Sequence, residues 1–174
     1  KIELASSLLF TLPGSPILYY GDEIGMGEEL SLPDRNGVRT PMQWEDAPAA
    51  GFATTADLYA PVIDRPPYGP RWVNVAAQRG DPGSLWNTIR RMIALRKSRQ
   101  ALCCGAIEWL EDGNRSVATY RRSGPGEGLI VTNNLSGQAR RVRVTAPGSA
   151  LVDLLSGRRF AAEANCLEVT LQPY

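Results

Sequence analysis

The chain has 174 residues, enough for one large or two small domains, and its formal net charge is only +1. A charge this close to zero gives no electrostatic case for a nucleic-acid or membrane partner. The sequence contains no histidine, which removes Ser-His and Cys-His nucleophilic sites and His-ligated metal sites, so we expect no metal and no cofactor.

Cysteine usage and hydropathy favour a cytoplasmic protein. The cysteines are Cys103, Cys104 and Cys166, and an odd count with two adjacent members argues against a disulfide framework. Reduced thiols are typical of the cytoplasm. We find no signal-peptide pattern at the amino terminus and no apolar stretch long enough to span a membrane.

The first predicted elements are a helix over residues 2–12 and a short strand over Ile17–Tyr20. Apolar residues recur at helical spacing up to Pro13-Gly14, which ends the pattern. Ile17–Tyr20 is apolar and aromatic without polar alternation, which suits a strand buried on both faces. Asp22 and Glu23 follow at once. A helix, a buried strand and polar residues at the strand's carboxyl end are the local arrangement of an α/β barrel, whose active face lies at that end.

Two runs of the sequence resemble a known family. Gly14–Met26 resembles the last barrel strand of the α-amylase family (glycoside hydrolase family 13), which reads roughly G-x-P-x-x-Y-Y-G-D-E-x-G-M there. Arg39–Trp44 resembles the R-T-P-M-Q-W that follows this strand in the α-glucosidase, oligo-1,6-glucosidase and trehalose synthase branches. Asp34–Val38 is most similar to the trehalose synthase branch, and this likeness extends through Val73–Gln78 and Asp81–Leu85.

The resemblance implies a two-part fold. Residues 1–104 would be the last helix-strand-helix portion of a TIM (β/α)8 barrel, with a long active-face loop over 27–80. Residues 105–174 would be an all-β, antiparallel sandwich domain. The family's nucleophile, acid/base and third carboxylate lie on earlier strands, so the resemblance places no catalytic residue in this chain and implies that the chain alone is inactive. The remainder of the barrel is then the expected partner.

The loop over residues 27–80 is punctuated by prolines and glycines. A stretch of this length inside a compact domain is either functional or wrongly assigned, and its place after a barrel strand favours function. Its aromatic residues either stack on sugar rings or fasten the loop to the barrel: Trp44, Phe52, Tyr59, Tyr68 and Trp72. Asp81 is then the predicted N-cap of an amphipathic helix that runs to about Ser98, with Pro82 at its first position.

After Gly105, short strand candidates alternate with turns, which is typical of an antiparallel sandwich. The candidates are 107–110, 117–120, 129–135, 140–145, 150–155 and 167–171. The apolar side chains expected to form the core are Ile107, Trp109, Val117, Leu129, Val131, Val142, Val144, Leu151, Leu154, Leu167 and Val169. We expect this half to fold on its own. We expect the first hundred residues either to be poorly protected from amide exchange or to be ordered only by docking on the rest of the barrel or on another copy of the chain.

Five residues are predicted to bind substrate: Asp22, Glu23, Asp34, Arg35 and Arg39. In the family, the position before N-x-x-R-T tends to hold an arginine that helps to define the pocket for the non-reducing glucose, and Arg35 matches it. A fixed guanidinium can donate to a hydroxyl while it pairs with a carboxylate. Asp22 and Glu23 suit hydrogen bonding at the mouth of the barrel, and Arg39, Gln43 and Trp44 suit bracing of the loop.

The resemblance therefore favours part of a retaining enzyme that interconverts maltose and trehalose by intramolecular glucosyl transfer. Two alternatives stay open. An α-glucosidase or oligo-1,6-glucosidase shares R-T-P-M-Q-W and would release glucose from maltose. A non-catalytic carbohydrate-binding or scaffold module would bind glycans without turnover.

Overall fold

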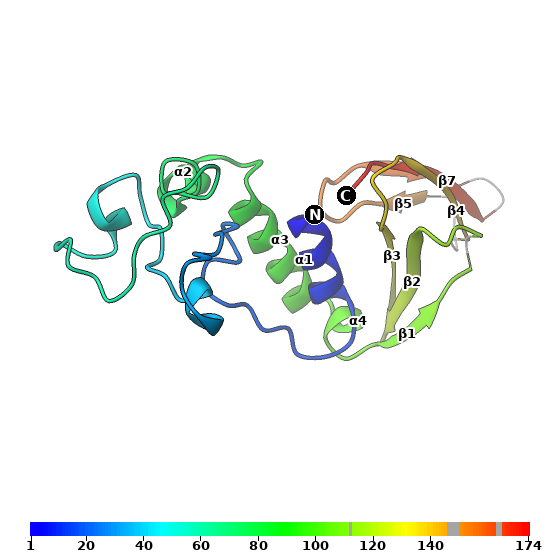
Figure 1. The fold of residues 1–174 in the computed structure, drawn as a ribbon. Helices are drawn as coiled ribbons and strands as arrows, with labels where there is room; N and C mark the ends of the chain where they lie inside the picture. The colour runs from blue at the N-terminus through cyan, green and yellow to red at the C-terminus, as the bar shows by residue number, and fades with distance from the viewer. Residues whose placement is uncertain (112, 146–149, 163–164) are drawn as a thin grey trace. The chain divides into compact units, whose positions relative to one another are not determined.

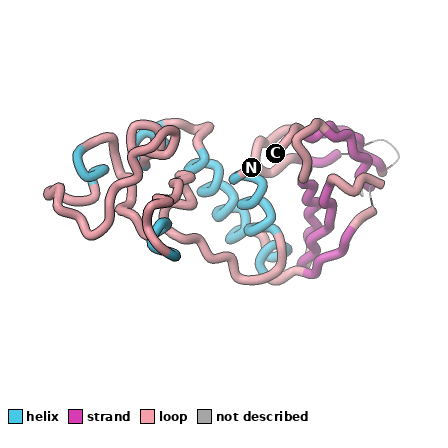
Figure 2. Tube along the Cα trace, in the orientation of Figure 1, coloured by secondary structure: helices cyan, strands magenta, loops and turns pink. Residues whose placement is uncertain are grey.

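The computed structural model describes residues 1–111, 113–145, 150–162 and 165–174. The chain forms two compact units, one made of Lys1–Pro16 with Arg91–Tyr174 and one made of Ile17–Arg90. Figure 1 traces the chain through its helices and strands, and Figure 2 shows that loops dominate the second unit while the strands all belong to the first.

The helical elements precede the strands in the chain. They are α1 (Ile2–Thr11), the 3-10 helices η1 (Asp34–Val38) and η2 (Pro48–Gly51), α2 (Val75–Gly80), α3 (Leu85–Ser98) and α4 (Gln100–Cys103). The strands are β1 (Ala106–Trp109), β2 (Val117–Gly124), β3 (Glu127–Asn134), β4 (Arg140–Thr145), β5 (Ala150–Val152), β6 (Arg159–Ala161) and β7 (Cys166–Leu171). The fold is thus the last portion of an α/β barrel followed by an antiparallel β domain, as the sequence predicts.

Helix α1 confirms the first predicted element, but the strand predicted at Ile17–Tyr20 is wrong. Residues 15–19 carry no regular structure in the part of the chain that is described, and the Ile17 side chain is 83% exposed. A strand exists only where a neighbour completes its hydrogen-bond ladder. Every strand that the described residues form lies between 106 and 171 and pairs with another strand of that region.

The long loop is predicted correctly in outline, but it holds three short helical elements that periodicity did not find. Helix α2 begins where Asn74 accepts a hydrogen bond from the Ala77 amide at 2.7 Å, the geometry of an N-cap. Asn74 Nδ2 also donates to the Pro70 carbonyl at 2.8 Å, which ties the helix to the preceding turn. Asn74, a residue type that often caps helices, was therefore the local sequence signal for the start of this helix.

Helix α3 begins at Leu85, not directly after Asp81. Asp81 Oδ1 accepts from the Gly83 amide at 2.8 Å and so closes a short turn ahead of the helix. Ser84 is the residue whose hydroxyl faces the first turn of α3, where it accepts from the Asn87 amide at 3.3 Å. Asp81 and Ser84, three positions apart, are both candidates for a cap, and the sequence prediction selected the earlier one.

The described residues of the β domain form three antiparallel sheets. They have the strand orders β1-β2-β3, β4-β7 and β5-β6. The β2–β3 hairpin turns at Pro125-Gly126, where Gly126 has φ 72°, the left-handed conformation that the second central residue of a type II turn requires. Of the predicted strands, 140–145 is matched residue for residue, whereas β6 was missed and the predicted 150–155 strand stops at Val152.

Asp153 explains the early end of β5. Its carboxylate accepts hydrogen bonds from the Leu155 amide at 2.9 Å and from the Ser156 hydroxyl, so the chain turns there. The core prediction is correct for Val142 and Val144, which are buried, and wrong for Trp109 and Leu154, which are exposed. Tyr120 and Arg122 are fully buried polar side chains that hydrophobic patterning did not identify.

Candidate functional site

The two sequence runs that carry the predicted site meet at Tyr20. The Tyr20 hydroxyl donates to the Thr40 carbonyl at 2.9 Å, so the first run contacts the second directly. Burial and the adjacent Tyr19 phenol raise the pKa of Tyr20, and the positive charge of Arg39 opposes that shift. Tyr19 and Tyr20 themselves lie with ring centroids 4.6 Å apart. Tyr20 was not among the predicted site residues, although its place beside Gly21-Asp22-Glu23 in the motif was a signal for it.

Asp22 and Glu23 stabilise the turn that contains them. Asp22 Oδ2 accepts from the Tyr19 amide at 3.0 Å, and Glu23 Oε2 accepts from the Gly21 amide at 2.8 Å. Gly21 has φ 93° and donates nowhere else in the turn, while its carbonyl accepts from the Ile24 and Met26 amides at 3.2 and 2.9 Å. Both carboxylates therefore have an oxygen committed to the backbone, which makes them shaping groups of this turn.

Arg35 and Asp34 lie next to each other on η1. Arg35 Nε is 3.4 Å from Asp34 Oδ2, and the two side chains are 69% and 79% exposed. An exposed ion pair of this kind contributes little to stability, at most about 1 kcal/mol. The guanidinium thus keeps most of its donor groups available for a ligand, while η1 itself is held by the Glu29 amide, which donates to the Gly37 carbonyl at 2.9 Å.

Gln43 is the polar centre of the loop. It is completely buried, and its Nε2 donates to the carbonyls of Tyr68 and Val73 at 2.9 and 2.6 Å. Its own carbonyl accepts from the Val75 amide at 3.0 Å. Gln43 Oε1 and the neighbouring Thr40 Oγ1 are buried without a hydrogen-bond partner among the described residues. The bracing role predicted for Gln43 fits these contacts.

Apolar packing joins the two runs beneath this network. Ile24 from the first run and Met42 from the second are buried together with Val75, and Met26, Val73 and Trp86 pack against them. Gln78 links the same region to α3, since its Nε2 donates to the Ile24 carbonyl at 2.7 Å and its Oε1 accepts from the Trp86 amide at 3.0 Å. The loop is therefore an ordered platform rather than a loose connection.

The exposed groups of this platform have a chemistry that is suited to ligand binding. Exposed donors and aromatic faces come from Arg35, Arg39, Tyr20 and Trp44, which suits a ligand rich in hydroxyl groups. Glycoside hydrolysis needs two carboxyl groups facing each other across the bond, whereas Asp22 and Glu23 each bond a backbone amide of their own turn through one oxygen. Among the described residues there is no group of three or more His, Cys, Asp or Glu side chains that could hold a metal ion.

None of the helices in the described ranges is long and apolar enough to cross a membrane. Cys103, Cys104 and Cys166 are all free thiols in this structure.

Comparison with known proteins gives matches over nearly all of the chain. Residues 1–105 match the family model described as alpha amylase, catalytic domain, and residues 107–174 match the one described as maltogenic amylase, C-terminal domain. A trehalose synthase from Pimelobacter sp. (strain R48) is 44% identical over 171 residues, which cover 93% of this chain and 30% of that protein.

A trehalose synthase/amylase TreS from Mycobacterium tuberculosis (strain CDC 1551 / Oshkosh) is 48% identical over 141 residues, which cover 78% of this chain and 24% of that protein. Among solved structures, a mutant of the trehalulose synthase MutB in complex with Tris superposes with a TM-score of 0.78 at 25% identity. That match covers 99% of this chain and 37% of the MutB chain. The chain thus spans about a third or less of the relatives that it matches.

Proposed function

The chain belongs to the α-amylase family, and from this premise we propose that it forms part of a trehalose synthase that interconverts maltose and trehalose. The observation that carries the proposal is the 44% identity to a trehalose synthase over 171 residues, because it extends through both family matches rather than through one motif. The Asp34–Trp44 run on the ordered platform lies within that similarity.

The proposed reaction is a retaining glucosyl transfer in a closed pocket. A nucleophilic carboxylate would form a glycosyl-enzyme intermediate with release of glucose, and the released glucose would attack the intermediate through another hydroxyl. In this proposal the nucleophile and the acid/base come from residues outside this chain. Without these two groups, the 174-residue chain alone would not stabilise the transition state and would be inactive.

The residues of this chain would bind and orient the sugar. Arg35 would donate to a hydroxyl of the non-reducing glucose, since its guanidinium is exposed and only weakly held by Asp34. Arg39, beside Tyr20, would add positive charge at the same surface. Asp22 and Glu23 would fix the Tyr19–Met26 turn beneath it, and Asp34 would keep Arg35 oriented.

Hydrolysis of maltose is the second candidate. It is favoured by one observation, that the Mycobacterium tuberculosis relative is named both a trehalose synthase and an amylase. An α-glucosidase would differ from the proposed enzyme in letting water, rather than the retained glucose, reach the intermediate. The three free thiols agree with a cytoplasmic location for either enzyme.

Product analysis with maltose tests the proposal. The complete polypeptide that carries these residues is incubated with maltose, and the sugars are separated by anion-exchange chromatography. Trehalose as the main product would support a trehalose synthase. Glucose alone would favour the hydrolase, and glycan binding without turnover would leave a non-catalytic carbohydrate-binding module.

A further inference from the structure

The carboxyl-terminal end of helix α1 is held by two arginines that are distant in sequence. The last turn of α1 contains no basic residue of its own. Arg96, from α3, donates through Nη1 to the carbonyls of Phe10 and Leu12 at 2.7 and 3.2 Å, and through Nη2 to the Gly14 carbonyl at 2.6 Å. Arg122, from β2, donates through Nη1 to the Thr11 carbonyl. Four consecutive or nearly consecutive carbonyls are therefore satisfied by side chains from two other elements.

Arg122 also bonds the connection between α4 and β1. Its Nη2 donates to the carbonyls of Gly105 and Leu102 at 2.9 and 3.4 Å, and its Nε donates to the Ala106 carbonyl at 3.4 Å. The side chain has no exposed surface, and Arg96 is 8% exposed. One buried guanidinium thus joins a helix end, a connecting turn and two strands.

The electrostatics explain how two like charges can be buried side by side. Burial and the charge of Arg96 lower the pKa of the Arg122 guanidinium, but an arginine is protonated at any physiological pH. The carbonyl end of α1 carries the negative pole of the helix dipole, so it offsets part of this repulsion. The charges are therefore matched to a helix end rather than to a carboxylate.

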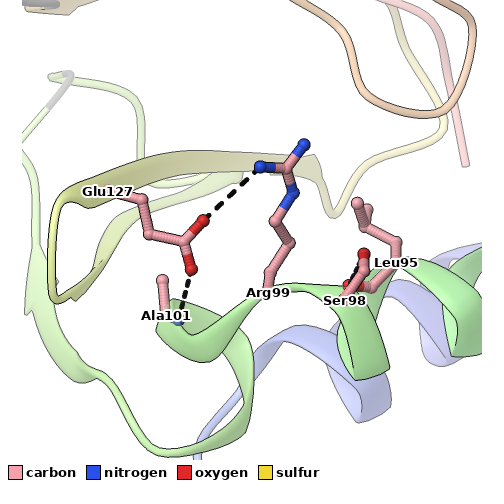
Figure 3. Close-up of polar contacts among 5 residues, drawn as sticks. All are labelled: Leu95, Ser98, Arg99, Ala101 and Glu127. Atoms are coloured by element: carbon pink, nitrogen blue, oxygen red, sulfur yellow. Dashed lines mark hydrogen bonds and ion pairs between the residues drawn. The ribbon is translucent and has the colours of Figure 1, made fainter.

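Other contacts run between the same elements. Ser7 Oγ donates to Asn133 Oδ1 at 2.7 Å, and Thr11 Oγ1 and the Tyr120 hydroxyl are 2.5 Å apart. At the α3–α4 junction, Glu127 accepts from the Ala101 amide at 2.8 Å and lies 3.5 Å from Arg99 Nη1, as Figure 3 shows. These bonds attach α1 and α4 to strands β2 and β3 at several separate points.

The close approach of α4 to the β2–β3 hairpin depends on two glycines. A Cβ at Gly105 would lie 2.4 Å from the carbonyl oxygens of Ala101 and Ser123, and one at Gly124 would lie 2.8 Å from the Ala101 amide nitrogen. Neither gap accepts a methyl group without a backbone shift. The packing of the connector on the hairpin is thus specified by backbone contact as well as by side chains.

We infer that Arg96 and Arg122 make α1, the end of α3 and the β1–β3 sheet one cooperative unit. We call their two guanidiniums and the four carbonyls of residues 10, 11, 12 and 14 the clasp. The boundary between folding units then lies within α3, near residues 90 and 91, rather than in the connector at residues 104–106 where the two family matches meet. Within this unit, the β domain holds the carboxyl-terminal end of α1 in place.

Amide hydrogen exchange in the complete polypeptide tests this inference, with an internally matched control. Arg122→Met removes the guanidinium and keeps an apolar stem. Arg121→Met is the control, because Arg121 lies on the opposite face of β2, where it pairs with the exposed Glu108 at 3.5 Å. With Arg122→Met we expect exchange to accelerate about tenfold or more in both α1 and the β2–β3 hairpin. With Arg121→Met we expect less than about a threefold change in either.

The two elements must respond together for the clasp to be real. Faster exchange in β2–β3 with α1 unchanged would overturn the inference, since it would mean that the elements open independently. If Arg122→Met does not fold, Ser7→Ala and Thr11→Val replace it as test variants, because each removes a single hydrogen bond between α1 and the sheet. Either of these changes should accelerate exchange in α1 and β2–β3 by similar factors, and a response confined to α1 would refute the shared unit.

Discussion

Replacing Gln43 by leucine should loosen the loop that carries the candidate site without unfolding the β domain. Leucine keeps a similar side-chain volume but removes both Nε2 donors, which bond the Tyr68 and Val73 carbonyls at 2.9 and 2.6 Å. Gln43 is completely buried, so water cannot replace these donors unless the loop opens. The substitution therefore isolates one feature, the polar centre of the loop.

The expected loss follows from the cost of two unsatisfied, partly buried carbonyls, less the gain from removing the unpaired Oε1 of Gln43. Each such polar group is worth about 1–3 kcal/mol, so the local opening free energy should fall by about 1–3 kcal/mol. Since every 1.4 kcal/mol is about tenfold, exchange of the amides that depend on this centre should accelerate roughly fivefold or more. The reporters are the Val75 amide, bonded to the Gln43 carbonyl, and the Ala76 amide, bonded to the Trp44 carbonyl.

Amide exchange of the complete polypeptide measures this change, and Gln138→Leu is the control because Gln138 is exposed in a turn of the β domain. The amides of β4 should exchange at the same rate in Gln43→Leu as in the parent protein. Exchange at Val75 and Ala76 that stays within about threefold of the parent would refute the bracing role of Gln43. Equal acceleration everywhere would instead mean that the substitution unfolds the whole molecule.

In the complete enzyme, Arg35→Ala should lower kcat/KM for maltose by about ten- to a thousandfold with nearly unchanged stability, because a charged donor to substrate is lost and the exposed Asp34 pair contributes little. Arg71→Ala, at another exposed arginine, is the control. Unchanged kinetics of Arg35→Ala would remove Arg35 from the site. The 174-residue chain alone should turn over neither maltose nor trehalose, and conversion above a buffer blank would contradict this. Burial raises the pKa of the Asp153 carboxyl, but hydrogen bonds from Ser156 and Leu155 outweigh it and leave the pKa below its ordinary 3.8. Asp153→Asn should therefore lower Tm slightly at pH 7, where the carboxylate stabilises the β5–β6 turn, and the difference should shrink as the pH falls through this lowered pKa; a difference that grows on acidification would reverse the assignment.

Helices α1 and α3 and most strands could be predicted because their signals are local. Alternation of Val142 and Val144 with exposed arginines identified β4 to the residue. Ile17–Tyr20 was assigned as a strand from its apolar composition, yet strand formation depends on neighbouring strands rather than on the segment itself. Ser84 shows a related limit at the start of α3, since Asp81 was an alternative candidate for the cap.

The candidate site was predicted from its motifs, but the contacts that support these segments were not. Arg35 and Arg39 are recognisable in the sequence, whereas the contact of Tyr20 with Thr40 joins segments 20 residues apart and has no periodic signal. The burial of Arg122 was equally hidden, because an arginine in a strand normally faces solvent. It is buried here since the carbonyl end of α1, more than a hundred residues earlier in the chain, meets its guanidinium.

The most direct test of the proposed trehalose synthase is an isotope experiment on maltose. The complete polypeptide is incubated with unlabelled maltose and an excess of free 13C-labelled glucose, and the disaccharides are analysed by NMR and mass spectrometry. Intramolecular glucosyl transfer predicts trehalose as the main product, with almost no label in it, because the released glucose stays in the closed pocket. Trehalose labelled in proportion to the free glucose would contradict intramolecular transfer, and glucose without trehalose would contradict the proposed function itself.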